Sequence, residues 1–209
     1  MEDAKHTLYS KEIEEEKIDM GNDLFQIVPK HTQYSLYLGN FDAEGAELND
    51  IYNILREDKP KTLEIFINSY GGLLSEGQRF QNIISNHFNN VDTCLDNKGY
   101  SMGALLFTFG DRRIVHEYSE IMFHNYSSSY YGKGHEIKQQ TKHDDITLGK
   151  YFKDSLRPFF KKEEIKDMLN GKDFWFDSKE MLKRNIATHI LIKGELIDSK
   201  TYLKTLKGK

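Results

Sequence analysis

Apolar residues fall in short runs that are separated by turn-forming residues over most of the chain. Runs rich in Val, Ile, Leu, Tyr and Phe and bounded by Gly, Pro or Asn predict strands, and apolar positions three or four apart predict helices. The predicted strands cover residues 24–28, 35–38, 63–67, 91–95, 113–116 and 120–123. The predicted helices cover residues 46–58, 75–87, 104–109, 135–156, 161–169 and 178–184. This alternation indicates an α/β fold with right-handed crossovers and a largely parallel sheet.

The pattern divides the 209 residues into one domain with two charged ends. Residues 1–23 are charged and weakly periodic, which fits either a flexible terminus or an ordered arm that contacts a partner. Residues 24–200 have enough apolar positions for a single core. Residues 201–209 are expected to form a basic, frayed tail.

The predicted helix over residues 135–156 has few apolar positions for its length. They are Ile137, Ile146, Leu148 and Phe152. A helix this long and polar buries little surface within one small domain. We therefore expect it to project from the domain and to pack against another subunit.

Composition excludes several classes of protein. Lys and Arg total 29 against 33 Asp and Glu, and no long basic block occurs, which argues against a nucleic-acid-binding protein. No apolar run approaches the roughly 20 residues that span a bilayer. The first residues lack the basic and apolar regions of a signal peptide, so a cytoplasmic protein is expected.

Candidate metal and cofactor sites are scarce. The single cysteine, Cys94, excludes an internal disulfide and a cysteine-rich zinc site, and it is expected to be a small buried apolar residue. Glu12–Glu16 and His143–Asp145 contain ligand-type residues, but their helical settings predict solvated faces. His87 and His116 are expected to be packing or surface residues. No phosphate-binding P-loop occurs, so no metal, cofactor or ATP hydrolysis is expected.

Two glycine-containing turns follow predicted strands and carry the candidate chemistry. Ser69–Gly72 follows one strand, and glycine there leaves backbone N–H groups uncovered for a developing oxyanion. Gly99–Gly103 has the G-x-S-x-G pattern, which lifts the hydroxyl of Ser101 onto a tight turn. Alternatively, Ser101 simply caps a buried helix and the first turn is simply a loop.

A serine nucleophile needs a base, and the base needs an orienting carboxylate. His124 follows an apolar run and so stands at the carboxyl end of a strand, where ligands collect in open α/β sheets. A structural histidine is the alternative. Asp173 is flanked by Phe174–Phe176, which are expected to screen it from water, and Asp177 is a rival that is better explained as a helix start.

Together these segments resemble the proteolytic subunit of the Clp protease family, the caseinolytic serine peptidases. The resemblance covers about residues 35–192 and rests on four motifs in register. They are Ile65–Gly72, Ser101–Ala104, Ile121–Asn125 and Asp173–Phe176. The resemblance implies a Clp protease/crotonase-like α/β fold of repeated β-β-α units, with a head domain and a protruding handle helix at about 127–160.

The resemblance also implies a role for each motif residue. Ser101 is similar to the family's nucleophile, His124 to its general base and Asp173 to its orienting carboxylate. The backbone N–H groups of Gly72 and Met102 correspond to the oxyanion hole. A serine endopeptidase that cuts unfolded polypeptides or peptides is the implied activity.

Substrate binding and assembly are likewise implied by the resemblance. Gly71 and the segment containing Ser127, Ser128 and Tyr130 fall where the family binds extended peptide by main-chain pairing. The handle implies heptameric rings that stack as a homo-oligomeric tetradecamer. The chamber is implied to be fed by an AAA+ unfoldase that hydrolyses ATP.

The chain departs from the family pattern at several positions. Tyr70 stands where proline is usual, and Asn185 replaces a usual glycine. Residues 1–34 match poorly. Three alternatives therefore stay open: a crotonase-like enzyme acting on acyl-thioesters, a non-catalytic ring subunit, and a phage capsid-maturation protease on the same fold.

Overall fold

The computed structural model describes residues 25–30, 33–41, 49–57 and 62–207. The N-terminal arm predicted over residues 1–23, including Glu12–Glu16, lies outside these ranges. None of the helices in the described part of the chain is long and apolar enough to cross a membrane.

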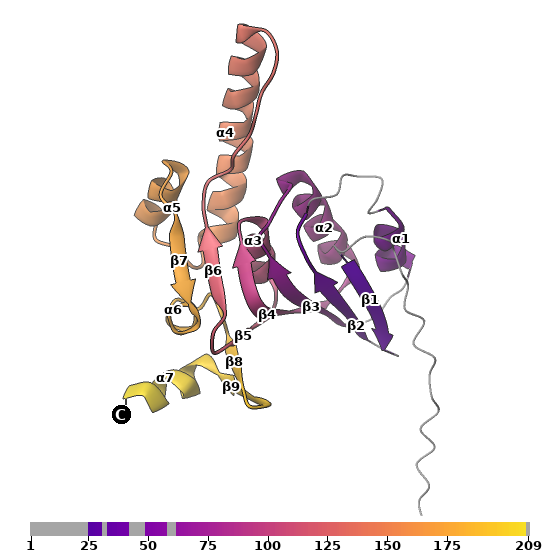
Figure 1. The fold of residues 1–209 in the computed structure, drawn as a ribbon, viewed down its shortest axis with the longest axis vertical. Helices are drawn as coiled ribbons and strands as arrows, with labels where there is room; N and C mark the ends of the chain where they lie inside the picture. The colour runs from indigo at the N-terminus through magenta and orange to yellow at the C-terminus, as the bar shows by residue number, and fades with distance from the viewer. Residues whose placement is uncertain (1–24, 31–32, 42–48, 58–61, 208–209) are drawn as a thin grey trace, which may run out of the picture.

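The described residues form one mixed sheet with helices around it (Figure 1). Its strands are β1 (Phe25–Lys30), β2 (Gln33–Leu38), β3 (Thr62–Ser69), β4 (Asn90–Tyr100), β5 (Arg112–His116), β6 (Glu120–Phe123), β7 (Phe174–Asp177), β8 (His189–Ile192) and β9 (Glu195–Asp198). The helices are α1 (Asn49–Glu57), α2 (Leu74–His87), α3 (Met102–Phe109), α4 (Gly134–Leu156), α5 (Lys162–Leu169), α6 (Ser178–Lys183) and α7 (Ser199–Lys207).

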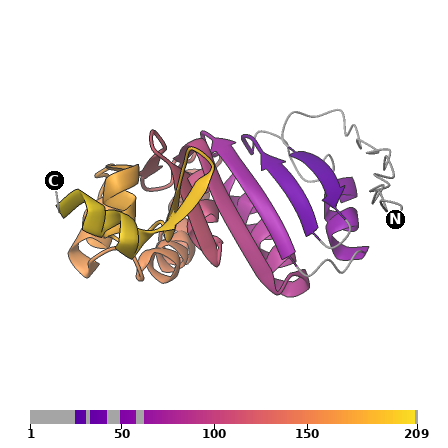
Figure 2. The ribbon, with the colours of Figure 1, turned by 90° about the horizontal axis from the view of Figure 1, so that it is seen from below.

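The predicted parallel sheet is confirmed, with antiparallel strands at its margins. Strands β2, β3, β4, β5 and β8 run parallel in that order. Strand β1 pairs antiparallel with β2, and β9 pairs antiparallel with β8, so β1 and α7 lie at opposite ends of the molecule in Figure 2. Strand β4 also pairs in parallel with β6, which in turn pairs antiparallel with β7.

The core lies between one face of the sheet and the helices α2 and α3. In β3 the side chains of Leu63, Ile65 and Ile67 are fully buried, and they alternate with residues that are partly exposed. Phe80 and Ile84 of α2 belong to the same hydrophobic cluster. The two-residue alternation of a strand therefore aims one face of β3 at the helices and leaves the other face partly open.

Helix α4 has the projecting form that its polar sequence predicts. Its buried residues are Gly149, Phe152 and Leu156, which all lie in its C-terminal third. The rest of the helix extends beyond the sheet, with residues 124–133 running beside it (Figure 1). Tyr126 donates a hydrogen bond to Asp145 at 2.7 Å and Tyr130 donates one to Asp144 at 2.6 Å, so these carboxylates hold the segment rather than forming only a solvated face.

Several sequence-based boundaries were wrong. Residues 199–207 form α7 instead of a frayed tail, and β7, β8 and β9 were not predicted. Strand β1 continues through Pro29, because a proline is tolerated on an edge strand. By contrast, the interpretation of Asp177 as a helix start is confirmed, because Asp177 is the N-cap of α6 and accepts from the Glu180 amide at 2.7 Å.

Candidate functional site

Three neighbouring strands bring Ser101, His124 and Asp173 to one edge of the sheet. Tyr100 at the end of β4 pairs with Met122 of β6, so Ser101 and His124 follow the carboxyl ends of adjacent parallel strands. Strand β7 begins at this same edge because it is antiparallel to β6.

The pairing of β6 with β7 also sets the register of the histidine and the aspartate. Phe123 pairs with Phe174 at the last position of this ladder. His124 and Asp173 therefore occupy facing positions one step beyond it. Residues that face each other in an antiparallel pair have Cβ atoms about 4.5–5.5 Å apart.

The backbone of Ser101 adopts a strained conformation. Its φ is 54° and its ψ is −120°, a region that non-glycine residues rarely occupy. Its N–H donates to the Met122 carbonyl at 2.9 Å, which fixes the turn against β6. Although Ser101 precedes α3, its side chain makes no capping hydrogen bond, so the hydroxyl is not used as a helix cap. A strand, a strained turn and a helix in this order match the setting of an activated serine.

The first glycine turn packs directly on the serine turn. Gly71 has a φ of 102°, and a Cβ at this residue would lie 2.6 Å from the Cβ of Ser101. Gly72 has a φ of 122°, and a Cβ there would lie 2.4 Å from the Phe41 carbonyl oxygen. Both positions therefore require glycine for backbone conformation and for space.

Two backbone N–H groups near Ser101 are left available. Phe41 donates to the Gly71 carbonyl at 2.7 Å and accepts from the Leu73 amide at 2.9 Å, so the N–H of Gly72 points away from Phe41. Met102 is the first residue of α3, where an amide has no intrahelical acceptor. Across the described ranges, neither amide donates a hydrogen bond that the structure records.

A cavity of about 830 Å³ lies over these turns. Its lining includes Tyr70, Gly72, Ser101, His124, Ser127 and Ser128. Asp173 is not part of this lining, and Tyr130 does not contact the cavity either. The cavity thus joins the serine, the histidine and one of the two amides, together with the start of the segment beside α4.

Asp173 is the most exposed of the three candidate residues in the single chain. Ser101 and His124 are half-buried, but Asp173 is exposed, and the neighbouring Trp175 is 56% exposed. The prediction that aromatic neighbours screen Asp173 from water is therefore wrong for the single chain. Within the described residues, no hydrogen bond joins the Ser101 hydroxyl, the His124 ring and the Asp173 carboxylate. Catalytic hydrogen bonds often tighten only when substrate binds.

Tyr70 stands where the family that the sequence resembles usually has proline, and its backbone makes a hydrogen bond that proline could not make. Its N–H donates to the Asn40 side chain at 2.7 Å, and Gly71 donates to the Ser69 hydroxyl at 3.0 Å. The sequence did not identify Asn40, because it lies 30 positions before Tyr70. A side-chain amide thus holds this turn.

Aromatic residues surround the turn. The Tyr100 ring contacts Tyr70 and Trp175 edge-on, with centroids 5.5 and 5.1 Å apart. Burial raises the pKa of Tyr100 well above its usual range, and its hydrogen bond to Glu120 raises this pKa further. The Tyr100 hydroxyl therefore remains a neutral donor and is not a candidate base.

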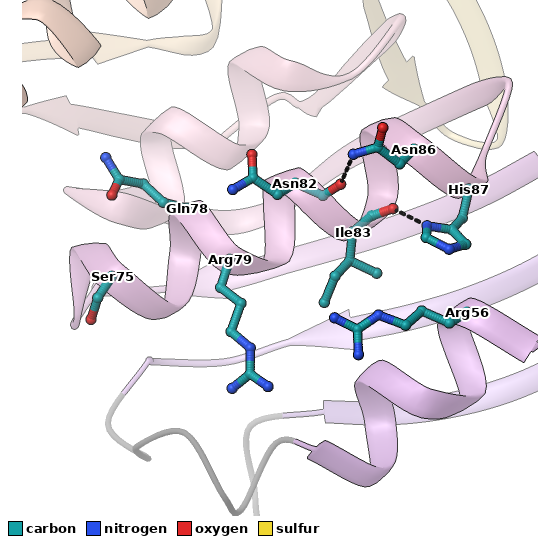
Figure 3. A pocket seen from close by; sticks show the side chains of 8 residues that line it. All are labelled: Arg56, Ser75, Gln78, Arg79, Asn82, Ile83, Asn86 and His87. Atoms are coloured by element: carbon teal, nitrogen blue, oxygen red, sulfur yellow. Dashed lines mark hydrogen bonds between the residues drawn. The ribbon is translucent and has the colours of Figure 1, made fainter.

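A second hollow, of about 600 Å³, adjoins the first along α2 (Figure 3). Ser75 and Gln78 line both hollows. The remaining lining side chains come from α1 and α2 and are mostly polar, as the sticks in Figure 3 show. His87, at the far end of the hollow, hydrogen-bonds to the Ile83 carbonyl at 2.8 Å and so stabilises the end of α2. None of the predicted catalytic residues lines this hollow.

Comparison with known proteins finds relatives of this chain in one family. The family model for Clp protease matches residues 47–193. The ATP-dependent Clp protease proteolytic subunit of Cyanophora paradoxa is 31% identical over 147 residues, which cover 66% of this chain and 72% of that protein. The proteolytic subunit 2 of Chlamydia pneumoniae is 31% identical over 105 residues, and the chain spans about half (51%) of that relative's length.

Proposed function

Because the chain belongs to the Clp protease family, we propose that it is a serine endopeptidase that hydrolyses unfolded polypeptides or peptides inside an oligomeric chamber. The observation that carries the proposal is the strained backbone of Ser101, whose hydroxyl makes no cap and lines a cavity with His124. A serine that only capped α3 would have no reason to adopt this conformation.

The proposed reaction begins when the Ser101 Oγ attacks the carbonyl carbon of a peptide bond. His124 accepts the hydroxyl proton as the bond forms. The negative oxygen of the tetrahedral intermediate accepts hydrogen bonds from the N–H groups of Gly72 and Met102. His124 then donates the proton to the leaving amine, and water releases the acyl group by the same steps.

Asp173 is proposed to orient the His124 ring. The facing positions of these residues beyond the β6–β7 ladder support this role, since side chains at facing positions of an antiparallel pair are close enough to interact. The exposure of Asp173 favours an arrangement that closes when substrate or a neighbouring subunit covers β7.

Peptide is proposed to bind in extended form between the Gly71 turn and the segment beside α4. Ser127 and Ser128 line the cavity, and the segment 124–133 has no strand partner within the described part of the chain. Apart from the amides of Tyr126 and Lys133, which donate to side chains, its main chain is therefore free to pair with a peptide whatever the peptide's side chains. The bond from Tyr130 to Asp144 holds the segment along α4, so Tyr130 acts by positioning it.

The chamber is proposed to form from heptameric rings that stack through α4 as a tetradecamer. The exposed Ile146 on this helix supports the proposal, since 63% of its surface is open to water in the single chain. An AAA+ unfoldase is the proposed source of unfolded substrate, because the relatives are named as ATP-dependent proteolytic subunits.

Hydrolysis of a fluorogenic peptide by the assembled protein tests the proposed function. Ser101→Ala and His124→Gln are each expected to lower kcat by about 10⁶-fold, and Asp173→Asn by about 10⁴-fold. Lys179→Gln, at an exposed position of α6, should leave the rate unchanged. Equal rates in the wild type and in Ser101→Ala would contradict the proposal.

A non-catalytic ring subunit is the second candidate, and the exposure of Asp173 favours it. This alternative predicts that the wild type assembles into rings but hydrolyses no peptide. In a mixed ring with a catalytically active subunit, inactivation of that other subunit would then abolish all peptide hydrolysis, because Ser101 of this chain would contribute none.

A further inference from the structure

Three metal-ligand side chains converge where strands β4 and β5 end their pairing. Cys94 and Asp96 are two residues apart on β4, so their side chains lie on the same face of the sheet. The last β4–β5 pair joins Leu95 to Val115, and His116 follows directly on β5. In the described part of the chain, this is the group of His, Cys, Asp and Glu residues whose ligand atoms come close enough together to share an ion.

The three ligand atoms form a nearly equilateral triangle. The Cys94 Sγ lies 3.6 Å from the His116 Nε2 and 3.8 Å from the Asp96 Oδ1, and the Nε2 lies 3.7 Å from the Oδ1. The separation of imidazole and carboxylate is too long for a hydrogen bond, which spans about 2.7–3.2 Å. The thiol makes long sulfur hydrogen bonds to both other side chains, and His116 and Asp96 form an ion pair when the ring is protonated. The three ligand atoms thus lie around one shared space.

We propose that Cys94, Asp96 and His116 bind a divalent transition-metal ion of the zinc type. Zinc lies about 2.3 Å from sulfur and about 2.0–2.2 Å from nitrogen and oxygen, so tetrahedral angles separate its ligands by about 3.3–3.6 Å. The observed triangle exceeds these edges by only a few tenths of an ångström. One thiolate, one imidazole and one carboxylate favour zinc over calcium or magnesium, which prefer oxygen ligands alone.

A second catalytic centre built on Cys94 does not fit the geometry. A cysteine–histidine–aspartate relay needs the thiol and the carboxylate on different ring nitrogens. Here both approach the same Nε2 of His116. Burial also raises the pKa of the Cys94 thiol to about 12, so this thiol is not an activated nucleophile in the absence of an ion.

An ion can reach the centre from solvent. The side chains of His116 and Asp96 are 38% and 42% exposed, whereas Cys94 is 5% exposed and lies beneath them. Three protein ligands leave the fourth tetrahedral position open for water. The opening on the solvent side supplies the entry path that a binding site needs.

The position of the ion gives it a structural role. Strand β4 leaves β5 after Leu95 and pairs with β6 from Lys98 onward. An ion bound by Asp96 and His116 ties the two strands together at this division. Strand β4 then continues to Ser101, so the ion stiffens the sheet that supports the proposed nucleophile.

The sequence did not predict this site because no local motif marks it. Cys94 and His116 are 22 positions apart, and each is unremarkable alone. The expectation that the chain holds no metal rested on the single cysteine and on runs of neighbouring ligand residues. The three ligand side chains come together where β4 stops pairing with β5 and begins to pair with β6, which only the folded structure shows.

Binding of Co²⁺ and Zn²⁺ to the chelator-treated full chain tests the proposal independently of peptidase activity. We expect one Co²⁺ per chain, with thiolate-to-cobalt charge-transfer absorption and the intense visible bands of tetrahedral cobalt. Cys94→Ser should abolish the charge-transfer band. Asp96→Asn and His116→Gln should each weaken Zn²⁺ binding, measured against a chromophoric chelator, by at least about 10- to 100-fold.

Two controls separate a built site from surface binding. His143→Gln removes an exposed histidine of α4 and should leave the affinity unchanged. Because Asp96 and His116 are largely at the surface, their variants should keep the wild-type circular dichroism even if Cys94→Ser does not fold. Absence of the charge-transfer band in the wild type, or Zn²⁺ affinity equal in the wild type, Asp96→Asn and His116→Gln, would overturn the proposal.

Discussion

The turns at Gly71 and Ser101 depend on each other at the level of single atoms. Gly71 lies so close to Ser101 that a methyl group added at Gly71 would overlap the Cβ of Ser101. Ser101 itself has a φ of 54°. Gly103 approaches Ser69 from the other side, where an added Cβ would lie 3.0 Å from the Ser69 Cβ. Small residues at these positions therefore set the place of the hydroxyl and of both proposed oxyanion donors.

Gly71→Ala is expected to destabilise the protein by more than about 1 kcal/mol, because alanine cannot adopt the positive φ without strain. It should also remove peptidase activity, since the serine turn must move to relieve the overlap. Chemical denaturation and the peptide assay measure the two effects. Gly149→Ala in α4 is the matched control, and it should stabilise the helix by about 0.5–1 kcal/mol, because no atom lies within 4 Å of the added Cβ. Wild-type stability and activity in Gly71→Ala would contradict this account.

At the scale of elements, local sequence patterns predicted the strands and helices that build the core. The remaining strands depend on contacts between distant parts of the chain, which local patterns do not reveal. The apolar periodicity of residues 75–87 and 135–156 predicted α2 and α4 almost to the residue. Strand β7 and hairpin β8–β9 were missed because they are short and partly exposed, and their pairing partners lie far away in the chain. The same lack of local information hid the register between His124 and Asp173, although the motifs had indicated both residues.

A bidentate ion pair joins Glu164 of α5 to Arg184, the C-cap residue that follows α6. The Arg184 guanidinium donates to both carboxylate oxygens of Glu164, at 2.9 and 3.1 Å, and it lies over the Phe176 ring at 4.6 Å. The hydrogen bonds from Arg184 hold the pKa of Glu164 below its ordinary value. This pair braces the end of β7 opposite Asp173.

Glu164→Gln is expected to lower the free energy of unfolding at pH 7 by about 1–2 kcal/mol, the loss usual for a charge-assisted hydrogen bond. The ionised carboxylate stabilises the folded state above the unfolded pKa of about 4.5. This contribution disappears as the pH falls through the lower folded pKa. Denaturation at pH 7 and pH 3 should therefore show a difference between variant and wild type at the higher pH alone. Glu163→Gln, at the exposed neighbouring position, should show little difference at either pH.

At the scale of the whole molecule, the single chain leaves two surfaces open to water. Helix α4 projects from the sheet with most of its surface in water. Asp173, just before β7, and Trp175 of β7 are exposed at the proposed active edge. The projecting helix was predictable, because its sequence is too polar to be buried in one domain. The exposure of Asp173 was not predictable, because its flanking aromatic residues suggested the opposite.

Ile146→Asp is expected to prevent the stacking of rings, because a charge replaces an apolar side chain in the proposed contact between α4 helices. Native mass spectrometry should find tetradecamers in the wild type and single rings or smaller species in the variant. Thr147→Asp adds the same charge at the next position, which points in a different direction, and should assemble as the wild type does. An unchanged distribution of species in Ile146→Asp would exclude this contact.

Covalent labelling by a fluorophosphonate probe tests the central claim most directly. The probe reacts with a serine only where a base and an oxyanion hole activate the hydroxyl. The account predicts one label per chain in the assembled protein, mapped by peptide mass spectrometry to Ser101 and strongly reduced in His124→Gln. A folded, assembled protein that takes up no label, or a label on any serine other than Ser101, would contradict it.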